Sequence, residues 1–147
     1  MNKLMIASAL VLVVLTSGCA SVPMASPERD AAAKTFTVKP DKANIYVYRN
    51  EMLGAAIKMP LVLNGKLVAD ISAGTYLLLE VSPGDHTIVS KTENDSTLTL
   101  TAAAGRNYFI WQEAKMGLFS PRSELQLVDE AIGKVGVAEC KLVETRQ

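Results

Sequence analysis

The residues best placed for chemistry stand near the start of the chain, where a cysteine follows a short apolar run. Lys3 supplies a positive charge, the run from Leu4 to Leu15 carries none, and Cys19 comes directly after three small residues. A basic start, a short apolar core and small residues at the exit are the three parts of a secretory signal. The run is too short to cross a bilayer comfortably, since a membrane-spanning helix needs about 20 apolar residues. The sequence therefore predicts an exported chain with a thiol at its cleavage point.

The segment Thr16-Ser17-Gly18-Cys19-Ala20 resembles the lipobox of bacterial lipoproteins. Thr16 departs from the leucine that most often stands three positions before the cysteine. The resemblance implies a signal peptide over 1–18, cut just before Cys19. It also implies diacylglycerol on the Cys19 sulfur and an amide-linked chain such as palmitate. Each buried methylene contributes about 0.8 kcal/mol and one chain anchors only marginally, so two or more give stable attachment. The alternative is an ordinary signal peptide that happens to carry a cysteine.

The residue after the cysteine bears on location. In the Gram-negative pattern an aspartate there favours the inner membrane, and this chain has Ala20. The resemblance therefore implies a protein lipid-anchored in the cell envelope, in the outer membrane and facing the periplasm.

Charge and cysteine content limit the functions that this protein can have. Removal of Lys3 with the signal leaves fourteen of the 15 basic side chains against 15 acidic ones, and no block of like charge occurs. This balance argues against nucleic acid as a partner. With Cys19 acylated, Cys140 has no partner within the chain. We expect Cys140 to be buried as a small apolar residue, and an intermolecular disulfide or redox role is the alternative.

No other group of side chains predicts catalysis, a metal site or a cofactor. His86 is the one histidine, and its neighbours are turn residues, so we expect it to hydrogen-bond locally. Glu93 and Asp95 flank a hairpin tip without the spacing of an EF-hand. Glu80 and Glu113 lie in expected strands, and their separation decides whether they could act as an acid and base pair. We expect a protein that is not an enzyme.

The rest of the chain divides into a tether and one domain. The segment 19–34 is rich in Ser, Ala and Pro and predicts a flexible tether after the acylated cysteine. Residues 35–147 predict a mainly β domain, a small antiparallel β-sandwich of about seven strands. A short C-terminal helix should follow Asp129, which is a suitable N-cap. Turn residues, above all Asn64-Gly65, delimit the expected strands, which are 44–49, 59–63, 66–71, 75–81, 86–91, 96–102, 106–113 and 124–128.

Five short motifs together resemble the DUF2846 domain, a family made up largely of short bacterial lipoproteins. The resemblance covers roughly Lys42 to Val143, and its middle portion also resembles the PEGA-type module, a small β-sandwich. It implies fold and location and brings no substrate or cofactor. The motifs are Ile45-Tyr46-Val47-Tyr48-Arg49, Leu63-Asn64-Gly65-Lys66, Gly74-Thr75-Tyr76, Val81-Ser82-Pro83-Gly84-Asp85-His86 and Gly105-Arg106-Asn107-Tyr108-Phe109.

Two apolar loops are the best candidates for a binding surface. They connect expected strands, and their large apolar residues are Met52, Leu53, Ile57, Met116, Leu118 and Phe119. If exposed, they form a contact patch for an envelope protein, a lipid surface or a hydrophobic ligand; otherwise they cover an open end of the sandwich. We expect the protein to be a membrane-anchored, non-catalytic binding or structural module, with no oligomeric state assigned. The alternative is a small-ligand or glycan binder with a cleft lined by aromatics such as Tyr46, Tyr48, Tyr108 and Trp111.

Overall fold

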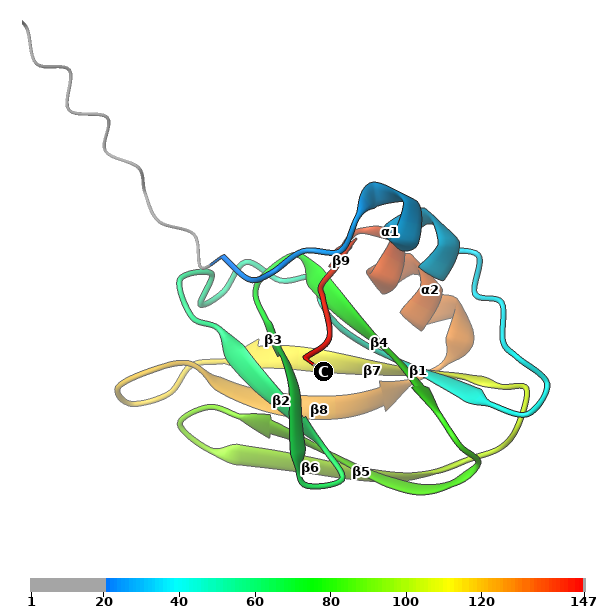
Figure 1. Cartoon of the computed structure of the whole chain (residues 1–147). Coiled ribbons are helices and arrows are strands. Elements are labelled where there is room, and N and C mark those ends of the chain that lie inside the picture. The colour runs from blue at the N-terminus through cyan, green and yellow to red at the C-terminus, as the bar shows by residue number, and fades with distance from the viewer. Residues whose placement is uncertain (1–20, 147) are drawn as a thin grey trace, which may run out of the picture.

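The computed structural model describes residues 21–146, and within them the chain folds as two packed β-sheets with two helices on one side (Figure 1). The expected signal peptide over 1–18 and the expected lipidation site, Cys19, lie outside the described residues. The elements in chain order are α1 (Pro27–Ala33), β1 (Ala43–Arg49), β2 (Met59–Leu63), β3 (Lys66–Ile71), β4 (Thr75–Val81), β5 (Gly84–Lys91), β6 (Asp95–Ala102), β7 (Asn107–Lys115), β8 (Arg122–Val128), α2 (Glu130–Ala138) and β9 (Lys141–Leu142).

The predicted β-sandwich with a C-terminal helix is confirmed. One sheet has five strands in the order β8-β7-β1-β4-β9, and the other has four in the order β3-β2-β5-β6. Most neighbours are antiparallel, as expected, but β1 pairs with β7 and β4 pairs with β9 in parallel. Parallel neighbours need a long crossover connection. Here the connection between β1 and β7 contains the whole four-stranded sheet, so no short sequence pattern predicts that β1 and β7 pair.

Short sequence patterns correctly predicted the positions of several elements. The Asn64-Gly65 turn joins β2 to β3, and both residues have positive φ, 49° and 83°, as this tight hairpin requires. Asp129 caps α2, where its side chain accepts a hydrogen bond from the Ile132 N–H at 2.9 Å. On β6, Leu100 and Ala102 are buried while the threonines between and beside them are exposed.

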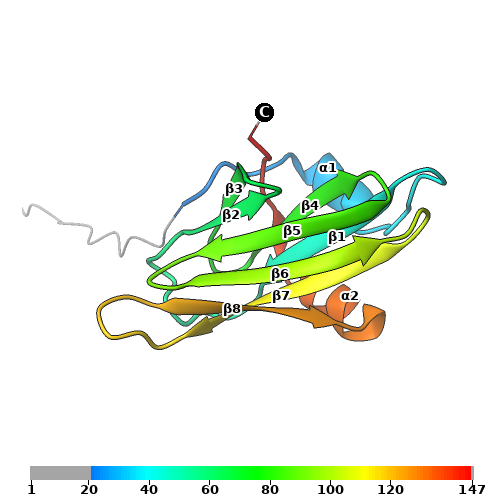
Figure 2. The ribbon, with the colours of Figure 1, turned by 90° about the horizontal axis from the view of Figure 1, so that it is seen from below.

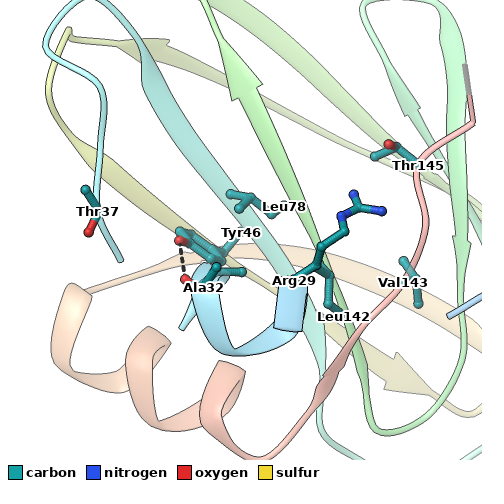
Figure 3. Close-up of a pocket in the computed structure, with 9 residues that line it drawn as sticks. Arg29, Ala32, Thr37, Tyr46, Leu78, Leu142, Val143 and Thr145 are labelled. Atoms are coloured by element: carbon teal, nitrogen blue, oxygen red, sulfur yellow. Dashed lines mark hydrogen bonds between the residues drawn. The ribbon is translucent and has the colours of Figure 1, made fainter. Parts of the chain in front are cut away.

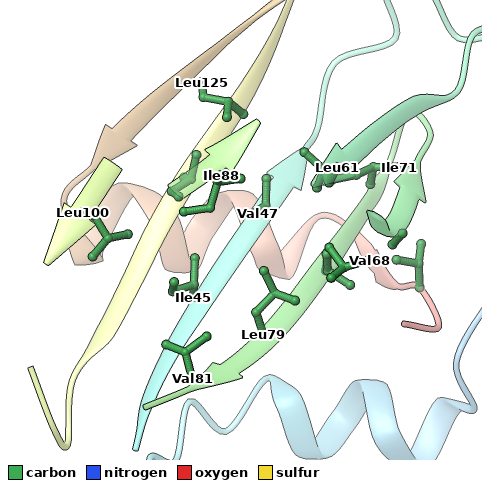
Figure 4. Close-up of a cluster of buried hydrophobic side chains, with 14 of the residues drawn as sticks. Ile45, Val47, Leu61, Val68, Ile71, Leu79, Val81, Ile88, Leu100 and Leu125 are labelled. Carbon is green, nitrogen blue, oxygen red and sulfur yellow. The ribbon is translucent and has the colours of Figure 1, made fainter. Parts of the chain in front are cut away.

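The main core lies between the two sheets (Figure 4). Strand β1 crosses the middle of the five-stranded sheet and is buried along its whole length. Ile45 and Val47 face the other sheet because successive strand residues point to opposite faces. They meet side chains of the four-stranded sheet such as Leu61, Ile71 and Ile88.

A second apolar cluster fills the space between the five-stranded sheet and the helices. It takes the other face of β1, with Tyr46 and Tyr48, together with Phe109 and Val137. The Tyr46 and Phe109 rings stack with centroids 5.1 Å apart. The sandwich is thus covered on one side by a helical layer, which lets the central strand bury aromatic residues on the face turned away from the main core.

The expected flexible tether over 19–34 differs from the structure, which packs this segment against the domain from Val22 onward. Ser26 caps α1 by accepting the Arg29 N–H, and Pro27 occupies the first turn, where its missing N–H costs nothing. The Asp30 carboxylate accepts the Tyr76 hydroxyl at 2.8 Å and the Leu142 N–H at 3.2 Å. These long-range bonds fix a short helix that the sequence alone does not demand.

Candidate functional site

The two apolar loops lie at one end of the sandwich because β1 and β7 run in parallel. Loop 50–58 follows the last residue of β1 and loop 116–121 follows the last residue of β7. Strands that run in the same direction deliver their following loops to the same edge. We call this end, formed by 50–58 and 116–121, the loop end. The predicted binding residues are exposed there, to 67% for Met52, 43% for Leu53, 37% for Ile57, 79% for Met116, 86% for Leu118 and 97% for Phe119.

Loop 50–58 is held by Arg49, a charged side chain that is fully buried. Its guanidinium donates to the carbonyl oxygens of Ile57 at 2.8 Å, Leu53 at 2.9 Å and Gly54 at 2.7 Å. Burial lowers the pKa of Arg49, and the nearby Glu51 carboxylate acts in the opposite direction. Since arginine keeps its charge in proteins, these carbonyls are the groups that satisfy a buried cation. The backbone of the loop is therefore fixed, while Met52 projects into solvent.

The two loops touch. Gly54 has a φ of 66°, and a Cβ built on it would lie 2.7 Å from Pro121 Cγ. The backbone of the first loop therefore packs directly on the proline ring of the second. Gly54 suits this contact twice, through its positive φ and its lack of a side chain. The loop end is one continuous surface.

Loop 116–121 is held by a carboxylate from a different hairpin. Glu93, in the turn between β5 and β6, accepts the backbone N–H groups of Phe119 at 3.2 Å and Ser120 at 3.1 Å. These bonds lower the pKa of Glu93, with Ser120 contributing most and Phe119 next. Gly117 lies so close to Glu93 and to the Ser120 carbonyl that a Cβ would overlap both. The loop is thus ordered through its backbone, and its large apolar side chains stay exposed.

Arg49 and Glu93 are the residues that sequence reasoning missed. Arg49 reads as an ordinary strand residue, and Glu93 reads as a solvated hairpin tip. The one available signal was the position of Arg49 at the end of a strand, directly before the apolar loop 50–58. Their partners are backbone groups, which carry no residue-specific pattern in a sequence.

The aromatic residues of the alternative binding cleft lie mainly in packed layers. Tyr46 and Tyr48 are 1% and 2% exposed and belong to the second apolar cluster, and Tyr46 also forms part of the wall of a groove beside α1. The helices cover that face of β1, and burial raises the pKa of Tyr46 to about 12. Trp111 packs partly buried against the same cluster, and Tyr108 accepts the Ala103 N–H through its hydroxyl oxygen at 2.8 Å.

His86 forms local hydrogen bonds, and Cys140 is buried. His86 Nε2 lies 2.7 Å from the Ser82 carbonyl, which can only accept, so Nε2 carries the proton and Nδ1 accepts from Asn64 Nδ2 at 2.9 Å. The expectation of local hydrogen bonding is confirmed. Cys140 is buried, as expected, and its burial raises the thiol pKa to about 12, with the Glu139 charge adding to the effect.

The acidic residues considered for chemistry are far apart or paired otherwise. Glu80 lies beside Asn44, which is opposite Asn107, and Glu113 stands six residues further along β7. At about 3.3 Å per strand residue this separates them by about 20 Å, so they cannot act as a pair. Asp95 pairs with Lys91 at 2.9 Å. Within residues 21–146, no three His, Cys, Asp or Glu side chains are grouped so that they could share a metal ion.

A groove of about 300 Å³ opens between α1 and the C-terminal segment. Figure 3 shows the Arg29 side chain on α1 extending toward the segment that carries Val143 and Thr145, with Leu78 of β4 on its other side, next to Tyr46. Arg29 Nη1 is 2.5 Å from a Glu144 carboxylate oxygen, which links the two walls. The groove therefore joins apolar side chains to a paired charge and could hold a small molecule.

These features define a small β-sandwich with a helical layer on one side and an ordered, exposed apolar surface at one end. The family model described as protein of unknown function (DUF2846) matches residues 39–124, and the chain belongs to this family. It is also 33% identical over 139 residues to an uncharacterized protein of Haemophilus influenzae, an alignment that covers 92% of this chain and 82% of the relative. No solved structure matches it. Among the described residues, no helix combines the length and apolar character needed to cross a bilayer.

Proposed function

We propose that this chain is a lipoprotein of the bacterial cell envelope, anchored in the outer membrane and facing the periplasm. Its sandwich then serves as a non-catalytic binding or structural module. The observation that carries the proposal is the order of Lys3, the apolar run, the small residues and Cys19, placed directly before a folded domain. Acyl chains on Cys19 would supply the membrane attachment.

The non-catalytic part of the proposal is supported by what the reactive side chains do. Both ring nitrogens of His86 are engaged by turn residues, and the Cys140 thiol is buried with a raised pKa. The conspicuous surface is instead the loop end, where Met116, Leu118 and Phe119 are exposed on an ordered backbone. Apolar surface of this kind is typical of contact sites.

The test is the fate of Cys19. The parent chain, expressed in a Gram-negative host, should yield a mature protein that starts at Cys19, carries the mass of its acyl chains and fractionates with outer-membrane lipids. Cys19→Ser should lose the added mass and the membrane association. Cys140→Ala is the matched control and should behave as the parent. An unmodified parent, or a Cys19→Ser protein that stays with the lipids, would refute the proposal.

The groove beside α1 favours a second candidate, a lipoprotein that binds a small ligand or glycan. Leu78 lies in the groove and Leu127 is an exposed leucine on β8. If the groove binds such a ligand, at least one compound from a panel of envelope glycans and small amphiphiles should raise the melting temperature of the parent. The same compound should raise the melting temperature of the control variant, Leu127→Trp. Leu78→Trp, which fills the groove, should abolish that shift. A shift that survives Leu78→Trp would place the ligand elsewhere.

A further inference from the structure

We propose that the loop end rests on the bilayer that holds the acylated Cys19, with Met116, Leu118 and Phe119 inserted among the lipid headgroups. This inference rests on the proposed acylation of Cys19. It deepens that proposal, because it assigns the exposed apolar surface to lipid and fixes which end of the sandwich faces the membrane.

The length of chain between the acylated residue and the domain is the first argument. Val22 is 8% exposed, and the next residues are tied down, since the Pro23 carbonyl accepts the Glu144 N–H at 2.9 Å and Met24 pairs with Val143. Three residue steps separate Cys19 from Val22. At a maximum of about 3.6 Å per residue, they span about 11 Å. The domain is therefore held against the bilayer.

The direction of the chain is the second argument. Figures 1 and 2 both show the first described residues, in blue, at the same end of the sandwich as loops 50–58 and 116–121. In Figure 2 the 116–121 loop, in orange, forms the outermost point of that end. A short attachment at this end turns the two loops toward the lipid.

The short attachment also selects lipid over a protein partner. A folded domain of 100 residues has a radius of gyration of about 13 Å. A partner of that size would not fit between the loop end and a membrane held within about 11 Å of Val22. The loop end faces the bilayer across this short distance, so we assign lipid as its binding partner.

The chemistry of loop 116–121 suits an interface. The loop has no charged residue; Arg122 follows it, and Lys115, which precedes it, is paired with Glu113 and Glu124. The apolar side chains then enter the headgroup region while Arg122 stays near lipid phosphates. Glu93 has already fixed the backbone, so insertion does not have to order the loop and loses less conformational entropy.

The experiment uses the full, acylated chain reconstituted in vesicles of phosphatidylethanolamine and phosphatidylglycerol, with or without bromine on the upper acyl chain. Phe119→Trp reports on the loop end. Lys66→Trp, at the exposed turn between β2 and β3, reports on the opposite end of β2, and the parent gives the Trp111 baseline. Both replaced side chains are exposed, so the fold should tolerate them. Flotation of the vesicles measures anchoring independently.

We expect Phe119→Trp to show blue-shifted emission and about twofold quenching by bromine, as insertion to the acyl boundary requires. Lys66→Trp should match the parent. Flotation without quenching at position 119 would overturn membrane docking and leave the anchor intact. Loss of flotation would refute acylation and docking together. A probe at 119 that becomes buried only when envelope proteins are added would also overturn lipid docking, in favour of a protein partner.

Discussion

The guanidinium of Arg49 donates a hydrogen bond to the carbonyl oxygen of Gly54 at 2.7 Å, from a side chain with no exposure to solvent. The two residues are five positions apart in the sequence. Through this bond, the last residue of β1 holds the backbone of the surface loop that follows it. Loop 50–58 thus depends on one buried cation.

Replacing Arg49 should loosen this loop and destabilise the domain. Arg49→Met leaves the carbonyls of loop 50–58 without their donor, and buried polar groups left unpaired cost about 1–3 kcal/mol. We expect Arg49→Met to lower the free energy of urea unfolding by about that amount. The loop should also become the first site of limited proteolysis. Arg122→Met, at an exposed position beside the other loop, is the control and should leave both measurements near those of the parent.

The Asp30 carboxylate should make stability depend on pH in the acid range. Burial alone would raise its pKa, but hydrogen bonds from Tyr76 and Lys34 and the Lys34 charge outweigh burial and lower it below 3.8. A group whose pKa is depressed by folding stabilises the protein above its unfolded pKa, and the contribution is lost as pH falls through the folded value.

Asp30→Asn should therefore be less stable than the parent at pH 7, and the difference should shrink as pH falls below about 3.8. Thermal unfolding at pH 7, 5 and 3 measures this. Glu28→Gln, on the exposed side of α1, should show no such convergence. A constant difference between Asp30→Asn and the parent at all three pH values would contradict a role for the charge.

Two glycines in α2 should resist replacement by alanine. A Cβ at Gly133 would overlap the Phe109 ring, and one at Gly136 would overlap the Tyr48 ring. Alanine improves helix propensity by about 1 kcal/mol. Overpacking a tight contact costs about 1–3 kcal/mol.

We expect Gly133→Ala and Gly136→Ala each to be less stable than the parent in urea, since the clash exceeds the gain in propensity. Val135→Ala, at an exposed site in the same helix, should be close to neutral. More stable glycine variants would show that α2 is free to move away from the sheet.

Cys140 should be unreactive in the folded protein. Its thiol is 1% exposed, and burial raises its pKa to about 12, so little thiolate forms at pH 8. In the Cys19→Ser background it is the one remaining cysteine, and we expect a disulfide reagent to label it only after urea is added. Rapid labelling of the native protein at pH 8 would contradict the burial.

The sequence by itself determined the local elements. Asn64-Gly65 specified the β2–β3 hairpin through positive φ, and Asp129 specified the start of α2 through its side-chain acceptor. Both signals act between residues close in the chain. The apolar composition of the two loops likewise identified the candidate surface.

Only the tertiary structure decided how these elements meet. The parallel pairing of β1 with β7 joins segments more than fifty residues apart and brings the two apolar loops together. Asp30 fixes α1 only because Tyr76 and Leu142 lie against it, and Glu93 orders a loop from another hairpin. Such bonds join distant residues to one another or to backbone groups, so spacing along the chain does not encode them. Composition could predict an apolar surface, whereas long-range packing decided that it would be exposed, ordered and placed at the end of the sandwich where the described residues begin.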